Sequence, residues 1–184
     1  AIVILEDFSV QKKYERHLKR LAQTDGLTRV LNNGSALERL QEEYLRAKRY
    51  KNDLSIMMVD MDHFKKINDQ YGHQKGDSVI RHTATKIKKN LREVDLIGRY
   101  GGDEFIIILP ETDEKSAKIA AERIRNMFDQ LSEKSSKGDI YSTVSIGISG
   151  LNSKGVDSMK ELIRTADRAL YYAKTAGRNR IIIQ

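Results

Sequence analysis

Carboxylates stand at the ends of two apolar segments, where they are well placed for chemistry. Asp60 and Asp62 close the apolar run Leu54–Val59, and Asp103 and Glu104 directly follow a pair of glycines. A charged residue next to so apolar a strand should be paired or bound to a metal. Two carboxylates from separate strand ends can share a Mg²⁺ ion, which prefers oxygen ligands and leaves room for substrate phosphates. This arrangement is similar to a two-metal phosphoryl-transfer site, although the pattern alone favours the alternative of acidic residues in ordinary surface turns.

The glycine pair Gly101-Gly102 separates two short apolar segments and predicts a hairpin. Taken alone it is a weak functional signal, because a tight hairpin that needs positive φ would use the same residues. The functional interpretation is that the missing Cβ atoms let a nucleotide lie against the backbone.

Composition narrows the class of protein. The chain has 184 residues, a length typical of one domain with a short extension. Its 33 Lys and Arg against 26 Asp and Glu give a net charge of +7, which fits either a phosphate-bearing partner or a Lys-rich solvated surface. The absence of Trp argues against a nucleic-acid partner, and the absence of Cys excludes disulfides and thiolate metal sites. No apolar run approaches the roughly 20 residues that span a membrane, and Ala1 is not an initiator Met, so we expect a fragment.

Periodicity predicts alternating helices and strands. Ser35 should cap a helix that reaches Tyr50 and buries Leu37, Leu40, Tyr44 and Leu45. Further helices are expected before residue 71 and over residues 9–23, 77–91, 114–131 and 158–175, with strands over 54–59, 95–100, 104–109, 140–149 and 180–183. A loop is expected over residues 72–76. This order, with one inserted hairpin, predicts an α/β or α+β sheet covered by helices.

Several segments between about residues 24 and 183 form distinctive motifs. They are Arg99-Tyr100-Gly101-Gly102-Asp103-Glu104-Phe105, the stretch from Asp60 to Asp69 (DMDHFKKIND), the loop from Tyr71 to Asp77 (YGHQKGD), the strand Val144–Ile148, and the stretch from Ala166 to Lys174 (ADRALYYAK) followed by Gly177-Arg178-Asn179. Together, and in their order along the chain, these segments resemble one known family, the GGDEF domains, or diguanylate cyclases.

The resemblance implies a fold and a metal site. The fold would be a central, mostly antiparallel sheet flanked by helices, as in nucleotide cyclases and polymerase palms, with an N-terminal linker helix. Asp60, Asp103 and the backbone carbonyl of Met61 would hold Mg²⁺, or Mn²⁺ in its place. Glu104 would either help to bind the metal or help to deprotonate the attacking hydroxyl, and Asp103 is the other candidate base.

The resemblance also implies how GTP is bound. Asn68 and Asp77 would read guanine, although a helix N-cap is the structural alternative for Asp77. Lys65 would stabilise charge on the phosphates. Lys174 and Arg178 would clamp the terminal phosphates, since four residues are about one helical turn, with solvated positive charge at a helix C-terminus as the alternative. The remaining substrate contacts would come from the backbone around His63 and Phe64 and from Gly101 and Gly102.

Because one domain binds one GTP and cyclic di-GMP needs two, the resemblance implies a catalytic homodimer. The 9–23 helix carries a narrow apolar face that favours a two-stranded seam, with packing of the helix on its own domain as the alternative. Residues 2–13 resemble the last strand and exit helix of a PAS sensor domain. We therefore divide the chain into residues 1–23, the end of a sensor with its signalling helix, and residues 24–184, the cyclase domain, which we expect in the bacterial cytoplasm with no membrane segment in this fragment.

A second nucleotide site is expected at Arg92 and Asp95. The Arg-x-x-Asp spacing shortly before Gly101 resembles the family's product-inhibition site, and Arg123 would complete it. An ordinary surface ion pair is the alternative for such a motif.

Arg29 and Asn33 depart from the early family loop, which often has Gly and Arg there, and this leaves the exact turn open. Three other functions remain as alternatives: a silent receptor for cyclic di-GMP or GTP, a polymerase-like or nuclease domain, and a mixed-dinucleotide cyclase, which Asp77 disfavours.

Overall fold

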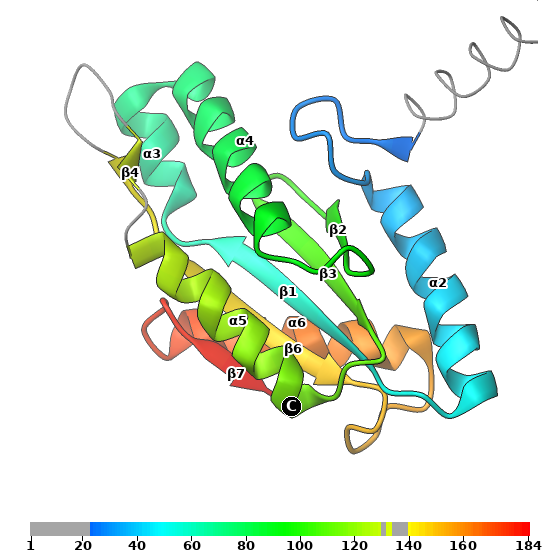
Figure 1. The fold of residues 1–184 in the computed structure, drawn as a ribbon. Helices are drawn as coiled ribbons and strands as arrows, with labels where there is room; N and C mark the ends of the chain where they lie inside the picture. The colour runs from blue at the N-terminus through cyan, green and yellow to red at the C-terminus, as the bar shows by residue number, and fades with distance from the viewer. Residues whose placement is uncertain (1–22, 130–131, 134–139) are drawn as a thin grey trace, which may run out of the picture.

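The computed structural model describes residues 23–129, 132–133 and 140–184 (Figure 1). The strand and helix expected before residue 23, and the sensor-like resemblance, lie outside these residues. The described helices are α2 (Asn33–Tyr50), α3 (Phe64–Tyr71), α4 (His73–Lys89), α5 (Glu114–Asp129) and α6 (Met159–Thr175). The strands are β1 (Leu54–Met61), β2 (Leu96–Arg99), β3 (Glu104–Pro110), β4 (Ser132–Glu133), β5 (Ile140–Tyr141), β6 (Val144–Gly150) and β7 (Ile181–Ile183).

The main sheet has five strands in the order β2-β3-β1-β6-β7, with the fully buried β1 at its centre. Strand β1 pairs antiparallel with both β3 and β6, β2 pairs antiparallel with β3, and β7 adds one parallel edge to β6. This confirms the expected mixed α/β fold with a mostly antiparallel sheet. The predicted hairpin between β2 and β3 is also present.

Alternating residues of β1 serve two separate hydrophobic cores. Met57, Val59 and Met61 face the core made with α3, α4 and α5, whereas Ile56 and Met58 face the core made with α2 and α6. Helices α4 and α5 can be seen lying across one face of the sheet, with α6 behind it (Figure 1). Since both faces of β1 are covered, a continuous apolar run is what this strand requires.

The start and the buried face of α2 differ from the prediction. Asn32, and not Ser35, is the N-cap, and its side-chain oxygen accepts the Ser35 backbone N–H at 2.9 Å. Leu45 is 58% exposed, so its predicted inward orientation is wrong. The buried face instead uses Leu40, Tyr44 and small residues that include Ala36 and Ala47. These small residues let the helix lie close to the sheet.

Two other boundaries also differ. Helix α4 begins at His73, because Gly72, at φ 84°, makes the whole turn between α3 and α4. The strand expected over 140–149 is two strands. Residues 140–141 pair with β4, and only from Val144 does the chain pair with β1.

We expect Gly147→Ala to lower the free energy of unfolding by at least about 2 kcal/mol, because overpacking a tight contact has this cost. A Cβ at Gly147 would lie 2.2 Å from both the Ala166 carbonyl oxygen and the Leu170 nitrogen of α6. Urea denaturation measures the change. Gly26→Ala is the matched control, since its Cβ would meet no atom within 4 Å. Equal losses in the two variants would contradict the packing account.

Candidate active site

The sheet brings the predicted carboxylates together. Asp60, near the end of β1, lies directly opposite Glu104, the first residue of β3. The Met61 backbone N–H donates to the Asp103 carbonyl oxygen at 3.4 Å, which places the residue before β3 beside the same strand end. Asp60 is buried, whereas Asp103 and Glu104 are partly exposed. Antiparallel pairing thus gathers three acidic residues at one edge.

A lysine counterbalances this acidic edge. The Lys174 ammonium of α6 lies 2.7 Å from Oδ2 of Asp60 and 3.9 Å from Oε1 of Glu104. Burial raises the pKa of Asp60 to about 6; the hydrogen bond and charge of Lys174 lower it, and the negative charges of Asp103 and Glu104 raise it further. Burial, with smaller contributions from the like charges, outweighs the lysine, so the charged form of Asp60 is disfavoured in the absence of further positive charge.

These groups fit a small divalent cation that shares its ligands with a substrate. Within the described ranges, no cluster of three or more His, Asp or Glu side chains has metal-binding geometry. Mg²⁺ is commonly held by one or two carboxylates plus phosphate oxygens and water, so a complete protein cage is not required. The position of the Lys174 ammonium between Asp60 and Glu104 marks a place where positive charge is favoured.

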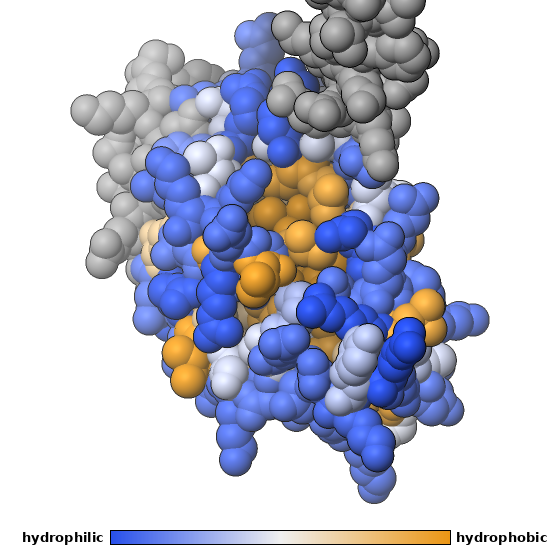
Figure 2. All heavy atoms as spheres, turned by 45° about the vertical axis from the view of Figure 1, so that its right-hand side comes forward, coloured by the Kyte–Doolittle hydropathy of each residue, from blue (hydrophilic) through white to orange (hydrophobic). Residues whose placement is uncertain are grey.

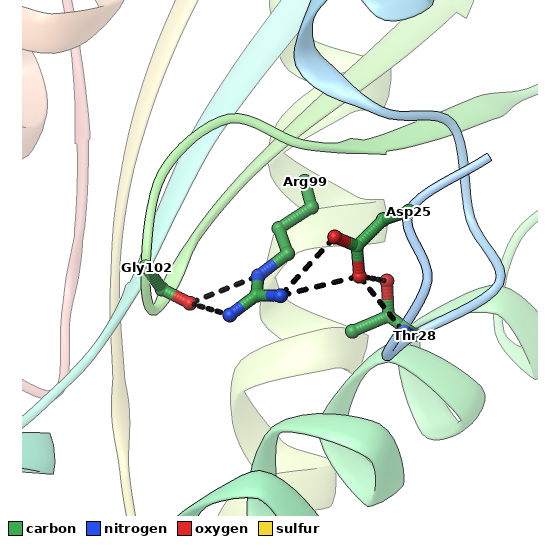
Figure 3. Close-up of polar contacts among 4 residues, drawn as sticks. All are labelled: Asp25, Thr28, Arg99 and Gly102. Carbon is green, nitrogen blue, oxygen red and sulfur yellow. Dashed lines mark hydrogen bonds and ion pairs between the residues drawn. The ribbon is translucent and has the colours of Figure 1, made fainter. Parts of the chain in front are cut away.

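An arginine fixes the glycine turn from the side (Figure 3). Nε and Nη2 of Arg99 donate to the Gly102 carbonyl oxygen at 3.0 and 2.7 Å, and Nη1 donates to both carboxylate oxygens of Asp25. Asp25 also accepts the N–H and hydroxyl of Thr28. Burial raises the pKa of Asp25, but the hydrogen bonds from Thr28 and Arg99 prevail and lower it. The charged Asp25 therefore holds Arg99 against the turn.

Sequence reasoning gave Asp25 and Arg99 no site role. The available signal was an arginine just before the glycine pair and an Asp-Gly turn far upstream. Leu31 supplies the connection, since its N–H donates to Ile97 and its carbonyl accepts from Arg99. The sequence leaves the exact turn at Arg29 open, because the family often has glycine at this position. Arg29 adopts the left-handed conformation there, with φ 60°.

The structural alternative for the glycine pair, a hairpin that needs positive φ, is wrong, because neither Gly101 nor Gly102 has a positive φ. Gly101 is required by space instead. A Cβ there would lie 2.7 Å from Oε2 of Glu104, whereas a Cβ at Gly102 would meet nothing within 4 Å. Gly101 thus leaves room for the Glu104 carboxylate.

The two residues assigned to guanine come from adjacent helices. A Cβ at Gly76 would lie 1.9 Å from Oδ1 of Asn68, so the Asn68 amide of α3 lies directly over α4 beside Asp77. Asp77 is exposed and stands within α4, so its alternative role as an N-cap is wrong. Gly76 brings Asn68 close to the helix that carries Asp77.

Helix α3 (Phe64–Tyr71) begins three residues after the end of β1 at Met61. His63 takes φ 59° and gives the helix no side-chain cap, and Phe64 is half-buried. Lys65 in the first turn is exposed. An uncapped N-terminus of this kind suits an anion.

The spacing argument for Lys174 and Arg178 is wrong. Helix α6 ends at Thr175, and Arg178 follows in a turn with φ 62°. The two side chains are therefore not one helical turn apart, and Lys174 instead reaches Asp60.

Arg92 and Asp95 lie away from the acidic edge, between two hollows. One is shared with Arg123 of α5, whose guanidinium donates to the Asn90 carbonyl oxygen. Asp95 accepts the Arg92 N–H at 2.8 Å through Oδ2. Over the residues that the structure describes, Oδ1 of Asp95 is the buried side-chain atom that lacks a hydrogen-bond partner. An unpaired buried acceptor beside two arginines is suited to an N–H donor of a ligand.

The second hollow lies between α2, α4 and β2, and the space-filling view shows an apolar floor framed by hydrophilic residues (Figure 2). Its apolar lining is Val30, Leu31, Leu91, Leu96 and Ile97, and its basic lining is Arg29, Arg39, Lys88 and Arg92.

No described helix is both long and apolar enough to cross a membrane.

Comparison with known proteins identifies the class. The family model described as diguanylate cyclase, GGDEF domain, matches residues 22–180. The chain is 40% identical to diguanylate cyclase DosC of Escherichia coli K12 over 158 residues, which is 85% of this chain and 34% of DosC. It is 36% identical to diguanylate cyclase DgcM of the same strain, over 98% of this chain and 43% of DgcM. The chain therefore belongs to the GGDEF family, and it spans between a third and a half of these relatives' length.

Solved structures of GGDEF-family proteins are similar to this chain in fold and in sequence. The coiled coil and GGDEF domain of DgcB from Caulobacter crescentus, in complex with c-di-GMP, matches with a TM-score of 0.90 and 30% identity over 98% of this chain and 95% of that one. Diguanylate cyclase SiaD from Pseudomonas aeruginosa, in complex with its activator SiaC, matches with a TM-score of 0.86 and 32% identity over 100% of this chain and 70% of that one.

We expect Asp60→Asn to stabilise the metal-free protein at neutral pH. The pKa of Asp60 is raised in the folded state to about 6, so its contribution to stability is present at low pH and lost as pH rises from about 4 to 6. Asparagine does not titrate. The stability difference between variant and wild type should therefore grow by about 1–2 kcal/mol between pH 4 and pH 7.5. Urea denaturation at both pH values measures it, with the exposed Asp69→Asn as control. A difference that does not change with pH would contradict the burial of a charged Asp60.

Proposed function

We propose that this domain condenses two GTP molecules into cyclic di-GMP and releases two pyrophosphates. The observation that carries the proposal is the buried Asp60 carboxylate facing Glu104 at the shared edge of β1 and β3, in a chain whose relatives are diguanylate cyclases. Because the substrate is GTP, the proposed place of action is the bacterial cytoplasm.

Asp60, Asp103 and the carbonyl oxygen of Met61 would hold Mg²⁺ or Mn²⁺, with Glu104 beside them. A bound divalent ion neutralises phosphate charge and lowers the pKa of an attacking hydroxyl. The surplus of negative charge at this edge and the placement of the Lys174 ammonium support the assignment.

The remaining residues bind and orient GTP. Lys65, Lys174 and Arg178 would neutralise the phosphates, and the N–H groups around His63 and Phe64 would receive one of them. Asn68 and Asp77 would recognise guanine, because a carboxylate accepts from N1–H and from the exocyclic amine that adenine lacks. Gly101 and Gly102, which lack Cβ atoms, would let the nucleotide lie against the backbone. Catalysis would come from positioning and charge stabilisation.

The reaction requires two domains. The 3′-oxygen of one GTP forms a bond to the α-phosphorus of the other, the bond from that phosphorus to the β-phosphate bridge oxygen breaks, and pyrophosphate leaves. The hydroxyl proton passes to water or to Asp103 or Glu104. A second, symmetric step closes the ring. A homodimer, arranged through residues 9–23 and an upstream sensor, would bring the two sites face to face.

Arg92, Asp95 and Arg123 would bind the product and inhibit synthesis. Support comes from the unpaired Oδ1 of Asp95 beside the hollow that both arginines line. The DgcB structure in complex with c-di-GMP shows that a domain of this fold binds the dinucleotide.

Incubation with GTP and Mg²⁺ should yield cyclic di-GMP, detected by mass spectrometry. Asp103→Ala should reduce the yield at least about a hundredfold, because it removes a group on which charge stabilisation depends. Asp69→Ala, on the exposed face of α3, is the matched control and should form product. If nucleotide-stripped protein forms no dinucleotide even when two copies are fused as a dimer, the proposed function is wrong.

Arg92→Ala should raise the cyclic di-GMP concentration for half-inhibition by at least about tenfold, since a hydrogen-bonded charged contact contributes about 1.4 kcal/mol or more. Initial rates of pyrophosphate release at increasing product concentration measure this. Arg81→Ala removes an exposed arginine of α4 and should leave the cyclic di-GMP concentration for half-inhibition unchanged. Unaltered inhibition in Arg92→Ala would place the inhibitory site elsewhere.

A further inference from the structure

Asp62 is a buried carboxylate for which the proposed chemistry has no use. It is 4% exposed and lies two residues after Asp60. Its Oδ1 accepts the Ser145 hydroxyl at 2.7 Å, and its Oδ2 accepts the Thr143 hydroxyl at 2.6 Å and the Asn179 backbone N–H at 3.0 Å. Three donors from two distant segments thus converge on one side chain. Hydrogen bonds to a charged acceptor of this kind are among the stronger ones in proteins.

The Asn179 bond holds an unusual turn. Gly177, Arg178 and Asn179 have successive φ values of 117°, 62° and 45°. Left-handed residues other than glycine cost about 1–3 kcal/mol each and persist where surrounding contacts fix them. Here the Arg178 N–H donates to the Ala173 carbonyl oxygen of α6 at 3.0 Å, and the next N–H donates to Asp62. The backbone of Arg178 is therefore fixed on both sides.

We propose that Asp62 is a positioning residue that sets the distance between the two ends of the bound triphosphate. The carboxylate belongs to the loop that follows the metal-binding Asp60, and it holds the turn that presents Arg178. Loss of Asp62 would free this turn and misplace the Arg178 guanidinium relative to Asp60. The inference rests on the proposed function, because it assumes that Arg178 binds the terminal phosphates of GTP.

The chemistry of the three donors distinguishes two substitutions. In Asp62→Asn, the amide oxygen can accept from Asn179 and Thr143, while the amide NH₂ donates to the Ser145 hydroxyl, which can also accept. In Asp62→Ala, the Asn179 N–H loses its acceptor, and a backbone N–H cannot reverse its role. Asparagine should therefore preserve the turn and alanine should not.

Binding of two nucleotides tests the proposal. The probes are GMP and a GTP analogue with a methylene bridge between the α- and β-phosphates, each titrated calorimetrically with Mg²⁺. Asp62→Ala should weaken binding of the triphosphate analogue at least about tenfold, because small misplacements of a binding group have large effects. GMP binding should change by less than about twofold, and Asp62→Asn should resemble wild type for both probes. If Asp62→Ala does not fold, Asp62→Ser, whose hydroxyl is too short to reach Asn179, carries the same expectation.

A double-mutant cycle separates positioning from general damage. In the Arg178→Ala background, Asp62→Ala should weaken binding of the GTP analogue by less than a further factor of about two, because the residue that Asp62 positions is absent. The proposal would be overturned if the two substitutions weakened analogue binding by independent factors that multiply in the double variant. Equal weakening of GMP binding and analogue binding by Asp62→Ala would also overturn it.

Hydrogen exchange separates this inference from the proposed function. In the nucleotide-free protein, Asp62→Ala should speed amide exchange over residues 177–180 and leave α6 protected. If wild type fails to bind the analogue, the proposed function fails, and the exchange result still decides whether Asp62 fixes the turn. Unchanged exchange would show that it does not.

Discussion

The carboxylate of Asp60, buried opposite Glu104 on the neighbouring strand, is the feature on which the rest of the site depends. Like charges placed directly across an antiparallel pair destabilise a sheet, and a desolvated carboxylate adds to that cost. The fold retains both residues and supplies Lys174 as a counter-ion. A site that keeps unfavourable negative charge at a strand end is prepared for a cation and for the phosphates that accompany it.

Polar contacts between distant segments hold the groups around this carboxylate from two sides. Arg99 ties the carbonyl of Gly102 to Asp25, so the glycine turn beside Glu104 is fixed to the beginning of the domain (Figure 3). Asp62 ties the other side of the β1 end to the turn after α6. Both supports link segments more than seventy residues apart, and both converge near the end of one strand. The position of each reacting group therefore depends on tertiary structure as well as on its own element.

Patterns within one element were predictable, and contacts between elements were not. Strand β1 was predictable from its continuous apolar run, because burial on both faces of a strand requires apolar residues at successive positions. The hairpin was predictable from the glycine pair between two short apolar segments. The start of α4 was missed because Gly72 and Gly76 together indicate a loop. Only the contact between Gly76 and Asn68 shows why a glycine belongs inside that helix. Arg99 and Asp25 were missed as site residues since no spacing rule relates positions that far apart.

The central claim is that the Asp60 edge binds a divalent cation together with GTP. Titration of Mn²⁺, followed by electron paramagnetic resonance with a GTP analogue that cannot be cleaved, tests it directly. Wild type should bind Mn²⁺ tightly only with the nucleotide, and Asp60→Ala should weaken this binding at least about a hundredfold, because a charged ligand is lost. Equal Mn²⁺ binding by wild type and Asp60→Ala would contradict the account.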